Sequence, residues 1–332
     1  MSAWPTACFS SAWSSSFSRP CSLPSTWWAK CRCLKCPDVS PLLLAYSMPY
    51  RPSVLLLLTL ALASILTLGG CKKLFPDYKT RTAYYLNAVP GAQPDSLLTC
   101  VTYNIQLGFR NGQDPWDAAQ RGGSAAHLDS LARVLSRVHP DIICLQEVPR
   151  NRSNVDTKDL LEQLAARLRM NYAFGAHGHN EPPGVKPARG EWGNAILTRF
   201  PIEGIDNREN EYVSVWQRRS ILSAELRVGP RRVRVYSLHF QPSEPAARTA
   251  AAYFRERAGD TQLILGDFNQ TAVPELPPAD YTDVLAPTPI NRGAIDRIYL
   301  SAGRFSTREV GIIPRSENVS DHPATYCRLR LL

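Results

Sequence analysis

The sequence Gln-Leu-Ile-Leu-Gly-Asp-Phe-Asn, at residues 262–269, decides the interpretation of this chain. Its short apolar run predicts a β-strand, and Asp267 and Asn269 follow directly after that strand. An aspartate beside a glycine is commonly no more than a turn residue, so this segment by itself indicates no function. The segment becomes evidence for a functional site because polar side chains also lie at the ends of several other predicted strands.

The order of the predicted elements favours an α/β fold. Apolar or alternating runs predict strands at residues 97–105, 141–145, 194–198, 220–228, 232–240, 262–265, 295–300 and 324–332. Apolar residues at helical spacing predict helices near residues 128–138, 160–168 and 246–257. Because strands dominate and helices stand between them, the simplest architecture is one domain of two packed sheets with helices outside, an α/β sandwich.

Eight polar or charged residues mark the edges of these strands. They are Asn104, Glu147, His239, Asp267, Asn269, Asp296, Asp321 and His322. Strand edges are where a rigid scaffold presents functional groups. Hard oxygen ligands such as Glu147 and Asp321 suit Mg²⁺ or Mn²⁺, and histidines beside carboxylates suit acid–base work near neutral pH. Each residue alone has a structural explanation, but together they indicate a metal-assisted active site.

Six short motifs occur in one order along the chain. They are Tyr103-Asn104-Ile105, Leu145-Gln146-Glu147, Gly193-Asn194-Ala195-Ile196-Leu197-Thr198-Arg199, Gly266-Asp267-Phe268-Asn269, Ile295-Asp296-Arg297-Ile298 and Ser320-Asp321-His322-Pro323. With them, residues 97–332 resemble the endonuclease/exonuclease/phosphatase superfamily, which includes DNase I-like nucleases, neutral sphingomyelinases and inositol polyphosphate phosphatases. The resemblance implies a DNase I-like four-layered α/β sandwich of two packed, mostly antiparallel sheets flanked by helices. It also implies Mg²⁺-dependent cleavage of a phosphate ester at one end of the sheets.

The resemblance also assigns a metal site. It implies that Glu147 is the main ligand of Mg²⁺, with Asn104 beside it and Asp321 as a further contributor. Mn²⁺ is a possible substitute for Mg²⁺. Arg199 lies in a motif of the superfamily with Thr198 in place of serine, and it either binds the substrate phosphate or supports the loop.

Five catalytic roles follow from the same resemblance. Asp267 is expected to orient or deprotonate the attacking water, and Asn269 to hold that water or the phosphoryl oxygens. His322 is expected to contact the scissile phosphate, oriented by Asp296. His239 is expected to act from the opposite side, where it stabilises charge or protonates the leaving oxygen. Whether Asp267 or His322 is the general base stays open.

The N-terminal region has the features of an export signal. Arg51 precedes an uncharged, mostly apolar run of 15 residues, Val54 to Leu68, and Leu68-Gly69-Gly70-Cys71 then resembles a bacterial lipobox with Cys71 as the lipidated residue. A plain membrane anchor and a buried helix are the alternatives, but 15 residues in a helix span only about 22 Å. We therefore expect an exported lipoprotein, anchored on the periplasmic or outer-membrane side.

These features divide the chain into four parts. Residues 1–47 form a disordered or mis-assigned leader, residues 48–71 the signal segment, residues 72–96 a linker and residues 97–332 the phosphoesterase domain. The full sequence has a formal net charge of +9. Without residues 1–71 the charge is only +5, which fits an anionic substrate without requiring nucleic acid.

The functional hypothesis is an exported, membrane-tethered, Mg²⁺-dependent phosphoesterase, and we expect it to be a monomer. A phospholipid or phosphoinositide-like head group is the favoured substrate, because a lipid anchor would place enzyme and substrate on one membrane. A DNA or RNA endonuclease of the same superfamily is the alternative. A non-catalytic surface binding protein is the alternative from another class, and the retention of all eight polar residues counts against it.

Several other residues have two interpretations. His177 and His179 could bind a metal or belong to a solvated, mobile loop over residues 175–190. Trp192 could stack on a substrate but is expected to pack, and Arg218 and Arg219 face either the cleft or solvent. The cysteines after residue 71 are expected to be buried apolar residues, although export would permit one disulfide, and they are Cys100, Cys144 and Cys327.

Overall fold

The computed structural model describes residues 82–94, 97–117, 119–177, 190–214, 217–241, 244–314 and 319–332. The predicted leader, the signal segment with Cys71 and the first part of the predicted linker lie outside these residues. Across the residues described, no helix has both the length and the apolar character needed to cross a membrane.

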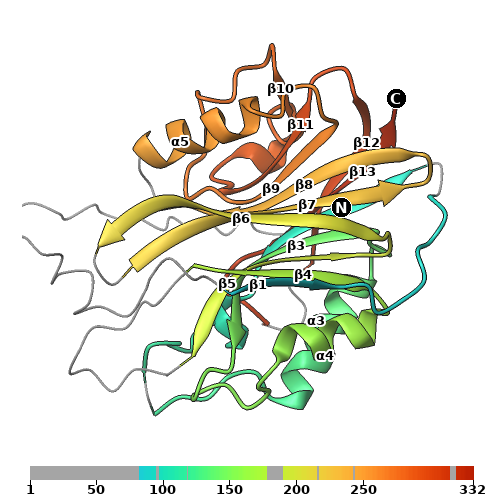
Figure 1. The fold of residues 1–332 in the computed structure, drawn as a ribbon. Coiled ribbons are helices and arrows are strands. Elements are labelled where there is room, and N and C mark those ends of the chain that lie inside the picture. Colours follow the sequence, from blue (N-terminus) through green and yellow to red (C-terminus); the bar gives the residue numbers. More distant parts are fainter. Residues whose placement is uncertain are drawn as a thin grey trace, which may run out of the picture. The chain divides into compact units, whose positions relative to one another are not determined.

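Two β-sheets form the body of the protein (Figure 1). The first has the order β1 (Ala83–Leu86), β4 (Asn171–Ala176), β5 (Glu191–Thr198), β3 (Ile142–Arg150), β2 (Leu98–Asn104), β13 (Ala324–Leu331) and β12 (Phe305–Ile313). The second has the order β10 (Tyr281–Asp283), β11 (Asp296–Ser301), β9 (Gln262–Asp267), β8 (Arg231–His239), β7 (Gln217–Val228) and β6 (Ile202–Ser214). Among the strands that the structure describes, only β2 with β3 and β8 with β9 pair in parallel.

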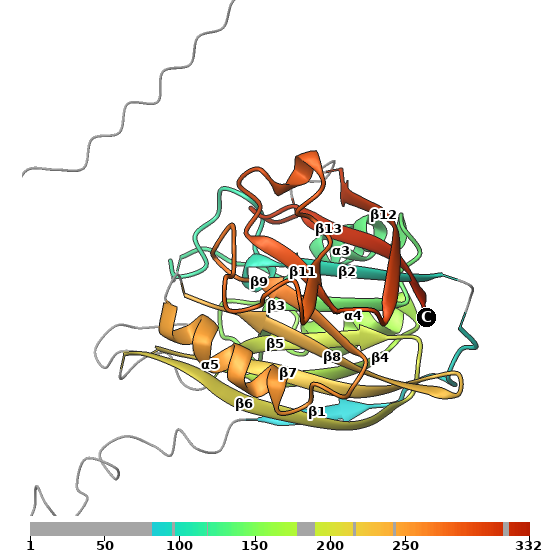
Figure 2. The same cartoon turned by 90° about the horizontal axis from the view of Figure 1, so that it is seen from above.

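Helices cover the outer face of each sheet. The first sheet carries α3 (Ala125–Ser136) and α4 (Leu160–Leu168), and α5 (Glu244–Arg255) lies across the second sheet (Figure 2). Ser124 begins α3 by accepting a hydrogen bond from the backbone N–H of His127 at 3.2 Å. The predicted sandwich of two packed sheets with helices outside is therefore confirmed.

Three apolar clusters hold these layers together. One lies between the two sheets and includes Ile142, Leu265 and Ile298. The other two join the sheets to their helices, through residues such as Leu131 of α3 and Phe254 of α5. Burying these side chains stabilises the fold by roughly 25 cal/mol per Å² of apolar surface removed from water. The cysteines in these layers, Cys100, Cys144 and Cys327, are buried and form no disulfide.

The fold corrects two predictions about the ends of the domain and its loops. Residues 83–86, which the sequence predicted to be linker, form β1 and pair with β4 at the edge of the first sheet. The predicted mobile loop at residue 175 begins too early, because β4 extends to Ala176 and His177 is fully buried. The strands β4, β6, β10 and β12 were not predicted.

The pairing of the strands brings the predicted functional residues to one edge. The strands β2, β3, β8 and β9 end at this edge, and β11 and β13 begin there. Asp267, the last residue of β9, pairs with His239 of β8 on one side and with Asp296 of β11 on the other. Two long-range registers therefore place three polar side chains next to one another.

Candidate active site

Asp267 is at the centre of the residue group at this edge. Its side chain is 1% exposed, and its Oδ2 lies 3.6 Å from Nε2 of His239 and 3.7 Å from Nε2 of His322. Its Oδ1 accepts a hydrogen bond from the backbone N–H of Asn269 at 2.9 Å. A carboxylate between two imidazoles is well placed to exchange a proton with a bound water.

Asn104 joins the two sheets at this point. Its Nδ2 donates to Oδ2 of Asp267 at 3.1 Å and lies 3.3 Å from Oε1 of Glu147, while its Oδ1 accepts from the backbone N–H of Gln106 at 3.0 Å. In this arrangement the amide acts as a donor that holds two carboxylates together. The metal-ligand role predicted for Asn104 would use the remaining lone pair of the same oxygen.

Glu147 reaches the site through an irregularity in β3. The pairing of β3 with β5 shifts between Leu145 and Val148, and Glu147 has a φ of 53°. Such bulges redirect a side chain and are common beside active sites. The side chain is 22% exposed, more than any partner it contacts there. Burial raises its pKa, against the opposing effects of the Arg219 charge and of Asn104. A nearby cation would stabilise the ionised form of this carboxylate.

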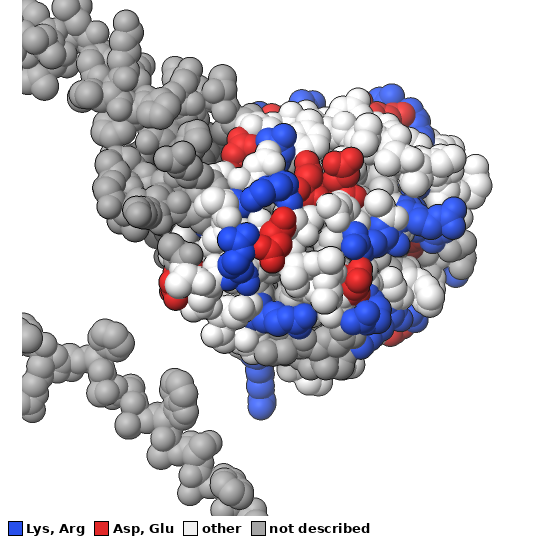
Figure 3. Space-filling view, turned by 90° about the horizontal axis from the view of Figure 1, so that it is seen from below, with Lys and Arg blue, Asp and Glu red and all other residues white. Residues whose placement is uncertain are grey.

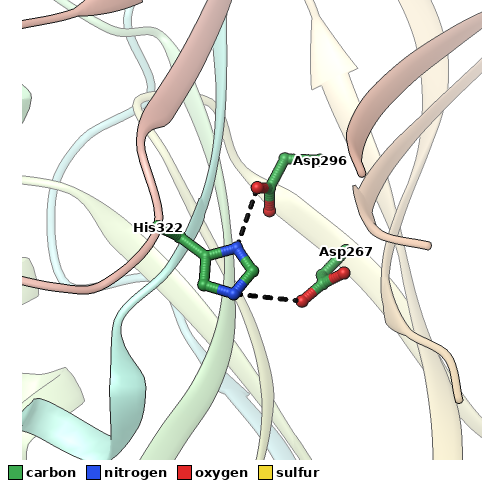
Figure 4. Close-up of side chains that lie close together, drawn as sticks. All are labelled: Asp267, Asp296 and His322. Atoms are coloured by element: carbon green, nitrogen blue, oxygen red, sulfur yellow. Dashed lines mark hydrogen bonds and ion pairs between the residues drawn. The ribbon is translucent and has the colours of Figure 1, made fainter. Parts of the chain in front are cut away.

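His322 and Asp296 form a hydrogen-bonded pair (Figure 4). Nδ1 of His322 lies 2.9 Å from Oδ2 of Asp296, so the carboxylate orients the ring and directs Nε2 toward Asp267. Burial lowers the pKa of His322, but the hydrogen bond to Asp296 and the nearby carboxylates outweigh it and raise the pKa to about 9. His322 is therefore an imidazolium at neutral pH.

The other two ionisable groups are shifted in different ways. Burial and the charge of Asp296 raise the pKa of Asp267 to about 6, against the opposing effects of His322 and Asn104. Burial, followed by the charge of Arg219, lowers the pKa of His239 well below its usual value, so its ring is neutral at neutral pH. The site thus contains a proton acceptor in Asp267, a cation in His322 and a neutral imidazole in His239. Acid–base chemistry needs groups that differ in protonation state at one pH.

Asn269 and Asp321 complete the predicted group. Asn269 follows β9 with a φ of 51°, and its Nδ2 donates to the backbone oxygen of Phe240 at 2.7 Å. Asp321 is exposed, and its backbone N–H donates to Oε1 of Gln106 at 3.2 Å. All eight strand-edge residues therefore lie at one edge of the sandwich.

A metal ion could bind at either of two places, between Asp267, Asp296 and His322 or beside Glu147. Ligand atoms of Asp267, Asp296 and His322 lie within 4.8 Å of one another. However, an ion between Asp296 and His322 would have to displace the 2.9 Å hydrogen bond that joins them. Glu147, which is partly open to solvent, fits a hard cation better, since carboxylate oxygens are the ligands that Mg²⁺ prefers. The geometry thus leaves Glu147 open to a cation and keeps Asp296 hydrogen-bonded to His322.

Arg199 does not lie at the site, which corrects its predicted role in substrate binding. It follows the C-terminal end of β5, and β5 runs antiparallel to β3, so Arg199 stands at the opposite end of the sheet. There its Nη1 contacts Oδ1 of Asp141 at 3.0 Å. Of the two roles considered, support of the loop is the one that this position allows.

Three residues with open interpretations lie beside His239. Trp192 is 2% exposed, its ring centroid is 4.7 Å from that of His177 and 6.2 Å from that of His239, and the guanidinium of Arg219 stacks over it at 4.7 Å. Nδ1 of His177 accepts from the backbone N–H of Ser220 at 3.1 Å. Trp192 packs as expected, and Arg219 is buried near the site. No local pattern indicated that His177 is buried, while His179 lies outside the described residues.

A sequence model of the Endonuclease/Exonuclease/phosphatase family matches residues 101–322, more than half of the chain. The chain belongs to the endonuclease/exonuclease/phosphatase family. The matched region begins in β2 and ends at His322, so it includes all eight strand-edge residues. Members of this family are phosphoesterases and nucleases.

Solved structures of the endonuclease/exonuclease/phosphatase family show the same fold. An endonuclease/exonuclease/phosphatase from Beutenbergia cavernae has a TM-score of 0.57 at 17% identity, covering 71% of this chain and 72% of its own. The human Nocturnin catalytic domain, solved with bound sulfate, has a TM-score of 0.55 at 14% identity, covering 78% and 99%. An endonuclease/exonuclease/phosphatase family protein from Bacteroides thetaiotaomicron has a TM-score of 0.52 at 18% identity, and the match covers 72% of this chain and 98% of that protein's chain. At these identities the likeness concerns the fold alone.

The chain is also similar to the uncharacterized protein YbhP of Escherichia coli K12. The two are 29% identical over 157 residues, which are 43% of this chain. The match spans 58% of YbhP, less than two thirds of its length.

Proposed function

We propose that this chain is an exported, membrane-tethered phosphoesterase that uses Mg²⁺, or Mn²⁺ in its place, to hydrolyse phosphate esters. A phospholipid or phosphoinositide-like head group is the favoured substrate. The observation that carries the proposal is the Asp267 carboxylate, held between two imidazoles with Glu147 at the open side. A carboxyl with a pKa of about 6 is largely ionised at neutral pH, yet basic enough to accept a proton from water.

Each residue then has a part in one displacement. Glu147 and Asp321, with Asn104, would hold the divalent ion, which supplies positive charge to the phosphate. Asp267 takes a proton as water adds to phosphorus, and Asn269 fixes the orientation of that carboxylate. The imidazolium of His322, oriented by Asp296, stabilises the equatorial phosphoryl oxygens. His239, whose ring is neutral, donates a hydrogen bond to the leaving oxygen. The bond to the leaving oxygen breaks, and the proton taken from water ends on that oxygen.

The modest net charge of the chain is what favours a lipid substrate over nucleic acid. On the face that carries α3 and α4, basic and acidic side chains are interspersed (Figure 3). An ion pair joins the two helices there, Arg167 of α4 with Asp129 of α3 at 2.7 Å. A protein that follows a nucleic acid backbone neutralises several phosphates with lysine and arginine side chains. The modest net charge outside residues 1–71 favours the same choice.

A substrate panel tests this proposal. The full chain is expected to hydrolyse a generic phosphodiester and at least one phospholipid in Mg²⁺, to lose activity in EDTA and to regain it when Mg²⁺ is restored, because Glu147 needs a cation to bind the phosphate. Plasmid DNA in the same buffer is the comparison. Nicking of DNA without cleavage of lipid would make the nuclease alternative correct. Absence of hydrolysis in both Mg²⁺ and Mn²⁺ would favour the binding protein.

The membrane tether has its own measurement. Mass spectrometry of the mature N-terminus from an export-competent bacterium is expected to find the chain beginning at Cys71 with a lipid mass attached. An unmodified chain that retains residues 48–70 would contradict the tether and leave the catalytic proposal standing.

A further inference from the structure

A cavity of about 380 Å³ lies beside His322, and residues of the candidate site form part of its wall. Its walls come from the segment that precedes β11, from β12 and from the start of β13, and they include Asp296, Asp321 and His322. The volume falls within the range of small-molecule sites, roughly 300–1,000 Å³. A group bound at the ring of His322, which lines the cavity, therefore has space to extend into it.

Part of the cavity wall is apolar and continues the core between the sheets. Ile290 and Ala294, from the segment before β11, pack against that core and line the cavity. Ile312 of β12 lines it as well and is 40% exposed. Val310, two residues earlier on the same face of β12, packs into the core. The cavity is thus the place where the core between the sheets opens to solvent next to a catalytic residue.

The charged residues at the cavity do not suit a second anionic group. Arg292 is the only lysine or arginine among the described residues that line it, and Asp296 and Asp321 line it as well. A site for a further phosphate would gather several cations. The apolar part of the wall, which includes Ile290, Ala294 and Ile312, instead fits an alkyl or aryl group, whose transfer from water is favourable.

The stereochemistry of displacement identifies which substituent would enter. Attacking and leaving oxygens lie roughly in line on opposite sides of phosphorus. Asp267 prepares the water, and Nε2 of His322 lies 3.7 Å from Oδ2 of Asp267, on the side of the attack. The leaving group therefore points away from His322. A substituent beside His322 is equatorial, and it stays on phosphorus after cleavage.

We infer that this cavity is a subsite for the apolar, non-leaving ester group of a phosphodiester. The inference rests on the proposed function and narrows it, because a phosphomonoester has no such substituent to place there. Water and the diester yield an alcohol and a phosphomonoester, and the phosphomonoester keeps the apolar group in the cavity.

A series of alkyl 4-nitrophenyl phosphates tests the inference with the full chain in Mg²⁺. The leaving group is constant, and the retained group is methyl, butyl or hexyl. Between methyl and butyl, kcat/KM is expected to rise about 30-fold, since each buried methylene contributes roughly a factor of three to four. 4-Nitrophenyl phosphate, the monoester, is expected to be a poorer substrate than the butyl diester.

Two serine variants provide the matched comparison. Ile312→Ser places a hydroxyl in the apolar wall, and the butyl-to-methyl ratio is expected to fall to a few-fold. Leu86→Ser changes a similarly exposed residue of β1, 47% exposed and away from the cavity, and the ratio should be unchanged. Equal rates for methyl and butyl esters in the unaltered chain, or a ratio untouched by Ile312→Ser, would overturn the subsite alone. Failure to hydrolyse any of the diesters in Mg²⁺ or Mn²⁺ would overturn the proposed function with it.

Discussion

Replacing His322 with glutamine is expected to lower kcat about 10³-fold, with a much smaller change in KM. The imidazolium develops its strongest interaction with phosphate as charge builds on the equatorial oxygens, so its loss affects the transition state more than substrate binding. Because the pKa of His322 is raised to about 9, activity of the unaltered enzyme should fall as the pH rises through about 9. Steady-state kinetics from pH 5 to 10 measures both effects.

His139→Gln is the control for this experiment, since His139 is an exposed histidine in the turn that precedes β3. The His139→Gln variant should retain full activity and show the same fall in activity as the pH rises through about 9. The account of His322 fails if His322→Gln keeps more than a tenth of the unaltered kcat, or if the variant still loses activity above pH 9 with the same profile.

The second large effect is expected for Asp267→Asn, which should lower kcat about 10³- to 10⁴-fold while it stabilises the folded protein. An amide cannot accept the proton of the attacking water. The unaltered enzyme should lose activity as the pH falls through about 6 or below, because protonation of Asp267 removes the base and a bound cation favours its ionised form. The residual activity of the variant should lack this acid limb.

The raised pKa of Asp267 sets the direction in which Asp267→Asn changes the free energy of unfolding. The pKa of Asp267 is raised from 3.8 to about 6 in the folded state, so the free energy of unfolding decreases as the pH rises from about 4 through about 6. Removing the carboxylate is expected to increase the free energy of unfolding by about 1–3 kcal/mol above pH 6, and by little below pH 4. Urea titrations in EDTA at pH 4 and pH 7.5 measure the difference. Destabilisation at pH 7.5 would contradict the account of a buried, unfavourable carboxylate.

Much of the site could be predicted from the sequence because its residues adjoin apolar runs. Asp267 follows such a run, Asp296 opens one and His239 ends one, so each was assigned to a strand edge. What the sequence does not contain is the register that pairs Asp267 with both of the others. Their proximity was inferred from the resemblance and becomes a physical statement only with the sheet.

The errors have equally specific causes. Arg199 belongs to a family-like motif, but β5 runs antiparallel to β3, and direction within a sheet leaves no local signal. His177 follows β4, whose burial depends on neighbours on both sides. In β12, polar residues such as Ser306 and Arg308 interrupt the apolar pattern because the strand is at an edge. Tertiary context decided each of these cases.

The most direct test of the central claim, that these side chains act on one phosphate, is kcat for the double variant Asp267→Asn/His322→Gln beside the two single variants. Residues that act as a unit are strongly non-additive. The account predicts that the double variant is about as impaired as the worse single variant. If the two losses multiply, so that the double variant falls by a further factor equal to the second single effect, the residues act independently and the account of one site is contradicted.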